Sequence, residues 1–261
     1  RLAPAEQQIL EAASLAGMTF STAAVAAALE KDMLETEDAC ARLAAQQRFL
    51  RPAGIIKWPD GTVAAGYGFL HALYQQLWNE RVTVSKLQQF HLRIGTRKEL
   101  AYGDQAGEIA LELAMHFEQG RDYHRAVRYL SQAGRNAIQR SAHHEAITLL
   151  SKGLDMLNEI PDSPERGQQE LTLQISLGAP LMATRGFAAP EVRETYTRAL
   201  TLCQQREETP QVFPVRSGLW LFYMMRAELH TAREVGIQML AQAERSQDTA
   251  MILQAHHTLW P

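Results

Sequence analysis

Hydrophobic positions recur at the three- and four-residue spacing of helices along most of the chain, and the first such segment covers residues 4–48. Pro4 suits a first helical turn, and Ser21 or Thr22 can cap a second helix. Asp32, with an acidic residue three positions later, has the spacing of a capping box. The segment therefore predicts three short helices. We expect the third to bury Leu34, Ala39 and Leu43.

The pattern changes after residue 48. Two β-type segments, residues 49–52 and 63–69, flank Trp58-Pro59-Asp60-Gly61, and Pro-Asp-Gly is a strong turn signal. This arrangement predicts a β-hairpin.

Helical spacing returns from Phe69 to about Arg81, with Leu73, Leu77 and Trp78 spaced for one face. Three helices, a hairpin and a closing helix together predict a winged-helix-like domain over residues 1–82.

Residues 83–261 contain helical spacing only, interrupted by short breaks such as Gly120-Arg121-Asp122, Ser141 and Ile160-Pro161. Paired helices with recurring small residues are typical of tetratricopeptide repeats, whose period is about 34 residues. The predicted fold class is therefore all-α, an α-α superhelix of tetratricopeptide-like (TPR-like) hairpins after the N-terminal winged-helix-like unit.

The best match to that repeat lies within residues 107–133. Large, small and aromatic residues stand where the repeat pattern requires them, at Leu113, Ala114, Phe117, Ala126, Leu130 and Ala133. Gly153, Gly178 and Gly218 lie inside helical patterns, where each glycine costs about 1 kcal/mol of helix stability relative to alanine. Close approach of a neighbouring helix would offset this cost, so we predict such contacts at the three glycines.

Composition adds constraints on the class of protein. The chain is 46% hydrophobic and 21% charged with a net charge of −3, which is typical of a globular, cytoplasmic protein. Its longest apolar runs, such as residues 220–225, are too short to span a membrane, and Cys40 and Cys203 lie in helical patterns as small hydrophobic residues. Residues 1–100 contain 11 Lys/Arg and 10 Asp/Glu, a balance that argues against nucleic acid as a partner.

Several long segments resemble one known family. They are Ala3 to Gln8, RFLRPAG and WPDGTVAAGYGFLHALYQQLWNERV in residues 48–82, HFEQGRDYHRAVRYLSQAGRNAIQRSAHHEAITLL in residues 116–150, and LGAPLMATRGFAAPEVRETYTRALTLC in residues 177–203. The chain is similar in these segments to the C-terminal arm of bacterial STAND-type signalling ATPases, particularly those fused to adenylate/guanylate cyclases, kinases or transcription-regulator modules.

The resemblance implies a winged-helix region followed by tetratricopeptide repeats, with a nucleotide-binding domain upstream of residue 1 that holds ATP or ADP. The sequence contains no G-x-x-x-x-G-K-[ST] motif, so we expect no cofactor and no ATP hydrolysis in this chain itself. The resemblance also implies that His71 contacts the phosphates of ADP bound to the upstream domain. The alternative for His71 is a packing or capping role.

Other candidate residues concern binding. Trp220, Tyr223 and Arg226 have the composition of a protein-binding hot spot, although helical spacing also favours their burial in the array. No carboxylate pair comes with a nucleophile in a recognisable motif, and adjacent histidines point in different directions on a helix, so we expect neither a catalytic nor a metal site.

The leading hypothesis is a non-catalytic regulatory arm that binds a protein partner on its repeat surface and transmits the result to the upstream nucleotide-binding domain. The alternative is a small-molecule (inducer) sensor of a transcriptional regulator or cyclase. DNA binding would need a basic recognition helix, and residues 33–48 offer only Arg42 and Arg48 as cations. A last repeat cut off at residue 261 would expose an apolar face, through which two copies could form a homodimer.

Overall fold

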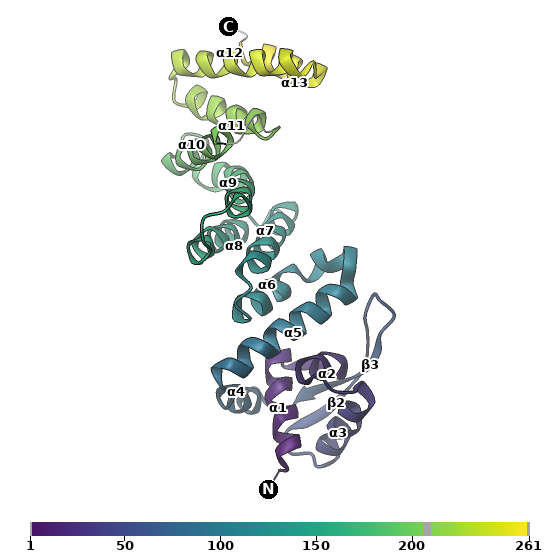
Figure 1. The fold of residues 1–261 in the computed structure, drawn as a ribbon. Helices are drawn as coiled ribbons and strands as arrows, with labels where there is room; N and C mark the ends of the chain where they lie inside the picture. The colour runs from purple at the N-terminus through teal and green to yellow at the C-terminus, as the bar shows by residue number, and fades with distance from the viewer. Residues whose placement is uncertain (1, 206–209, 260–261) are drawn as a thin grey trace. The chain divides into compact units, whose positions relative to one another are not determined.

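A computed structural model describes residues 2–205 and 210–259 of the 261-residue chain (Figure 1). It divides into two compact units, residues 1–129 (unit 1) and 130–261 (unit 2). The described residues are mostly helical, and they contain one small three-stranded sheet in unit 1. The mainly helical class predicted from the sequence is therefore confirmed.

Unit 1 begins with three helices around an alanine-rich core: α1 (Pro4–Ala16), α2 (Thr22–Leu29) and α3 (Met33–Ala45). Two predicted caps are confirmed, because the Ser21 side chain accepts a hydrogen bond from the amide of Ala23 and the Asp32 carboxylate accepts from those of Leu34 and Glu35. Of the residues expected on the buried side of α3, Ala39 and Leu43 are buried. The prediction for Leu34 was wrong, since position N2 of the capped helix faces solvent.

The predicted hairpin is confirmed as β2 (Leu50–Lys57) and β3 (Val63–Phe69), paired antiparallel. A third strand that the sequence analysis assigned to a helical segment, β1 (Thr19–Ser21), pairs with the other edge of β3 and gives the order β1-β3-β2. Three residues are too few to show the alternation that identifies a strand. In the turn, Gly61 adopts a φ of 87°, which favours glycine.

The rest of unit 1 consists of α4 (Ala72–Glu80), α5 (Val84–Tyr102), the short 3-10 helix η1 (Gly103–Ile109), α6 (Ala110–Gln119) and the start of α7 (Tyr123–Gln139). Helix α5 packs against α1 and α2 on one side and against η1 and α6 on the other (Figure 1). It therefore joins the N-terminal helices and the following helices into one core.

Unit 2 contains the end of α7 and a series of helices in which each packs mainly against its neighbour in the chain (Figure 1). Their bounds are α8 (His143–Met156), η2 (Leu157–Glu159), α9 (Pro164–Arg185), α10 (Pro190–Gln204), α11 (Val212–Met225), α12 (Leu229–Ser246) and α13 (Thr249–Thr258). All six residues matched to the repeat pattern between positions 113 and 133 are buried.

The division into compact units falls inside α7, whereas the sequence analysis placed a domain boundary between residues 82 and 83. Helix α5 follows residue 82 directly and packs on α1 and α2, which explains why residues 1–82 do not form a compact unit alone. Compactness does not decide where an independently folding domain ends, so that boundary stays a prediction.

The predicted close approach at helical glycines is confirmed in unit 2. A Cβ at Gly178 in α9 would lie 2.2 Å from the hydroxyl oxygen of Tyr196, and one at Gly218 in α11 would lie 2.4 Å from its Cζ. The ring of Tyr196, on α10, therefore fits into a slot between α9 and α11. The slot is open only because glycine occupies both positions that face it. Gly153 faces the flexible end of Leu173 instead, at 3.1 Å.

We predict that Gly178→Ala or Gly218→Ala destabilises unit 2 by about 2 kcal/mol or more, because the added methyl collides with a rigid ring and this outweighs the higher helix propensity of alanine. Chemical denaturation followed by circular dichroism measures the change. Gly153→Ala is the control and should cost less. In a Tyr196→Ala background, Gly178→Ala should no longer destabilise unit 2. If the loss of stability were undiminished, the Tyr196 ring would not be its cause.

Candidate functional site

His71 lies at the N-terminus of α4 and caps it. Its Nδ1 accepts a hydrogen bond of 3.1 Å from the backbone N–H of Leu73. A neutral imidazole that accepts at Nδ1 carries its proton at Nε2, so His71 presents one N–H donor from an exposed position. The capping role that the sequence analysis left open is therefore present, and the nucleotide-sensing role stays a prediction.

The apolar face of α4 is exposed. Leu73 and Leu77 are 65% and 47% accessible, and Tyr74 in the same helix and Leu70 just before it are also exposed. The sequence analysis grouped Leu73 and Leu77 with Trp78 on one face, but only Trp78 is buried, where its ring meets the ring of Phe49 edge-on. Residues 70–79 contain no charged Asp, Glu, Lys or Arg, so this face is both apolar and neutral.

The three candidate binding residues of α11 have different environments. Trp220 is half-buried and donates from its indole N–H to the carbonyl oxygen of Thr258, 3.2 Å away in the segment that closes α13. Tyr223 is half-buried, whereas Arg226 is exposed and pairs with Glu228 at 2.6 Å. Trp220 thus holds two helices of unit 2 together, and Arg226 remains accessible to a partner.

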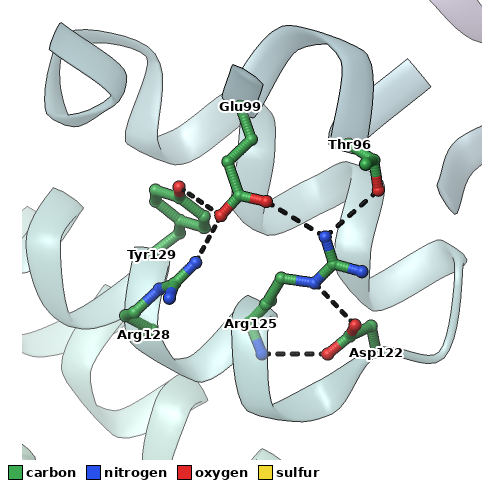
Figure 2. Close-up of polar contacts among 6 residues, drawn as sticks. All are labelled: Thr96, Glu99, Asp122, Arg125, Arg128 and Tyr129. Atoms are coloured by element: carbon green, nitrogen blue, oxygen red, sulfur yellow. Dashed lines mark hydrogen bonds and ion pairs between the residues drawn. The ribbon is translucent and has the colours of Figure 1, made fainter. Parts of the chain in front are cut away.

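Glu99 in α5 is the centre of a polar network that sequence reasoning missed (Figure 2). Its carboxylate accepts hydrogen bonds from Arg125 at 3.0 Å, from the hydroxyl of Tyr129 at 2.7 Å and from Arg128. Arg125 also donates to Asp122 at 2.6 Å and to Thr96 at 3.1 Å. The network ties α5 to the first turns of α7.

The network is balanced in charge, because two guanidinium groups face two carboxylates (Figure 2). Arg125 stacks over Phe117, whose ring stacks on that of Tyr129 at 5.7 Å. Burial, and then the bond to Glu99, raises the pKa of the Tyr129 hydroxyl to about 12, so this hydroxyl stays a donor at physiological pH. Such an arrangement positions helices and leaves no net charge for a ligand.

A second polar group lies between α5 and α6. The Nδ1 atoms of His91 and His116 are 2.9 Å apart, and both rings are buried, at 5% and 0% exposure. His116 Nε2 has no hydrogen-bond partner and lies 3.8 Å from Glu112 Oε1, which is too far for a hydrogen bond. Lys98 donates to the same oxygen.

These contacts change the acid–base behaviour of the group. Burial, and then the charge on a protonated His116, lowers the pKa of His91 to about 4. Burial raises the pKa of Glu112, but His116 and the Lys98 ammonium outweigh this effect and leave it at about 2. At neutral pH His91 is therefore uncharged and Glu112 is ionised. His91 and His116 are 25 positions apart, and Lys98 and Glu112 are 14 apart, so no local motif could have indicated these two contacts between α5 and α6.

Other candidate chemistry is limited. Cys40 and Cys203 are buried free thiols, as expected, and burial followed by the charge of Glu37 raises the pKa of Cys40 to about 12. Across residues 2–205 and 210–259, no three His, Cys, Asp or Glu residues form a group that could hold a metal ion. No helix in the same ranges has both the length and the apolarity to cross a bilayer.

We predict that Glu99→Gln destabilises unit 1 by about 1–2 kcal/mol, since Arg125 and Arg128 lose a shared anion at a half-buried position. Denaturant unfolding of the variant measures this loss. Arg128→Ala is the control and should cost under about 1 kcal/mol, because its side chain is largely exposed. Equal costs for the two variants would contradict a central role for Glu99.

We predict that acidification from pH 6.5 to about 4 destabilises the protein through His91, whose folded-state pKa lies below the ordinary 6.5. The unfolded chain takes up the proton first, so stability is full above pH 6.5 and falls by up to about 1.4 kcal/mol per pH unit below it. Unfolding curves across this range, compared with those of His91→Gln, isolate the contribution. His144→Gln, at an exposed position, should keep the wild-type slope.

Comparison with known proteins assigns no family, since no family model matches the chain. The chain is similar to an uncharacterized protein of Rhizobium meliloti (strain 1021), with 26% identity over 196 residues, or 74% of this chain. The match covers 19% of that relative, so the chain spans less than a fifth of its length.

Proposed function

We propose that the chain is the non-catalytic regulatory arm of a larger STAND-type signalling ATPase, in which partner binding on TPR-like helices is coupled to an upstream nucleotide switch. The three N-terminal helices, the three-stranded sheet and α4 of unit 1 suit a winged-helix-like module, and the successive helices of unit 2 suit a TPR-like superhelix. The much longer relative is consistent with a chain that is one part of a multidomain protein.

The observation that carries the proposal is the combination of features on α4. An amphipathic helix in a compact protein normally buries its apolar stripe, yet α4 exposes Leu73 and Leu77 on a face without charge. The same helix presents the N–H donor of His71 at its N-terminus, where the helix dipole favours an anion. A nucleotide-binding domain docked on this face would bring a phosphate to His71.

Regulation then follows from differential binding. Suppose that α4 binds the upstream domain more tightly in the ADP-bound state than in the ATP-bound state. The contact then stabilises the ADP-bound state by the difference between the two binding free energies. A protein partner that binds near Tyr223 or Arg226 would shift the same equilibrium if it also distinguishes the states. No hydrolytic chemistry is assigned to this chain, whose role is to bias a switch located elsewhere.

We predict that His71→Ala and His71→Asn both weaken ADP binding several-fold and raise basal ATP turnover in the full-length protein. Calorimetry and an ATPase assay measure the two effects. His71→Asn is the decisive variant, because asparagine is a preferred N-cap and preserves the start of α4 while removing the imidazole. If His71→Ala alone changes ADP binding, the residue acts only as a cap and the nucleotide-sensing proposal fails.

A further inference from the structure

A cleft of about 470 Å³ opens in unit 1, a volume within the range of small-molecule sites. Its walls come from the C-terminal end of α1, from β1 and from α4, α5 and α6. Leu87 and Met115 supply apolar surface, and the polar lining includes His91, Glu112 and Gln75. The cleft is separate from the exposed apolar face of α4 and from the network around Glu99.

When the rings of His91 and His116 are both neutral, the hydrogen-bond pattern behind the cleft selects the tautomer of His91. With both rings neutral, one of the two Nδ1 atoms must donate to the other. If His116 donated, its buried Nε2 would hold a lone pair facing the Glu112 carboxylate, which is unfavourable. In that neutral state His91 donates from Nδ1, His116 keeps its proton at Nε2, and the Nε2 of His91 is an acceptor.

Two further acceptors belong to the same lining. Lys98 and His116 both face Oε1 of Glu112, which leaves Oε2 of this ionised carboxylate for another donor. The side-chain amide of Gln75 donates to the backbone oxygen of Ser14 at 2.9 Å, so its own carbonyl oxygen is the acceptor that remains. Among the described residues that line the cleft there is no Lys or Arg. The lining therefore offers hydrogen-bond acceptors and one carboxylate, Glu112, which Lys98 pairs with through Oε1 only.

From this chemistry we infer that the cleft binds a small organic cation, a primary ammonium or guanidinium compound. Its N–H groups donate to His91 Nε2 and to the Glu112 carboxylate, and its alkyl part packs on Leu87 and Met115. A neutral alcohol lacks the charge, and a carboxylate or phosphate would meet Glu112 with the wrong sign. The inference goes beyond the regulatory-arm proposal and does not depend on it.

Putrescine and agmatine are suitable probes, with butane-1,4-diol as the neutral analogue and succinate as the anionic one. Titrations of the 261-residue chain near neutral pH, followed by calorimetry and by ¹⁵N signals of the histidine rings, measure binding. We predict saturable binding of an amine, with a change at an unprotonated Nε2 of His91, and no binding of the diol or of succinate.

Three variants test the site. Glu112→Gln should weaken amine binding at least tenfold, and so should Asn79→Lys, which places a competing cation on the cleft wall at a half-buried position. Glu108→Gln removes the same charge from an exposed position outside the cleft and should leave affinity unchanged. Failure of both amines to saturate, preferential binding of succinate, a protonated His91 Nε2 or wild-type affinity in Asn79→Lys would each overturn the inference.

Discussion

Helix α5 is the element on which unit 1 depends, because polar contacts anchor it to four other helices of that unit and to the hairpin turn. It carries apolar residues such as Ile94 into the core and, along its length, charged residues that reach α1, the end of α2, the hairpin turn, α6 and α7. The contacts are Lys86 to Glu11, Arg93 to the backbone oxygen of Ala28, Arg97 to Asp60, Lys98 to Glu112 and Glu99 to Arg125. Each alone contributes little at a partly exposed position, but a helix held at successive turns cannot rotate or slide.

Close packing on α5 also creates the histidine pair. A Cβ on Gly95 would lie 3.1 Å from that of His116 and 3.2 Å from the ring of Phe117, so glycine allows α6 to approach α5 closely. At that separation the Nδ1 atoms of His91 and His116 lie within hydrogen-bond distance, and the protonation states of the two rings become interdependent. The contact between the two histidines therefore depends on close helix packing at Gly95 and not on the local sequence around His91 alone.

The sequence predicted the features that depend on short-range chemistry. Caps at Ser21 and Asp32, the Pro-Asp-Gly turn and the close approach at Gly178 all follow from the conformational preferences of individual residues. It could not predict that Leu73 and Leu77 face solvent, because periodicity identifies a face but not what covers it. Nor could it find Glu99, whose partners are 26 to 30 positions away and meet it only after α5 and α7 have packed.

The network around Glu99 and the histidine group beside the cleft differ in how many hydrogen-bond acceptors they leave without a donor. In the network around Glu99 each carboxylate faces a guanidinium, so a ligand would have to displace a formed ion pair at a net cost. At the cleft Glu112 is also ion-paired, with Lys98, but through Oε1 only, so Oε2 and the carbonyl oxygen of Gln75 remain as acceptors. Helix α4 supplies Gln75 and Asn79 to that cleft while its opposite, apolar side is exposed. A molecule in the cleft and a domain on the apolar side would therefore contact the same short helix, and if its position differs between two states, each would alter the affinity for the other by the same factor.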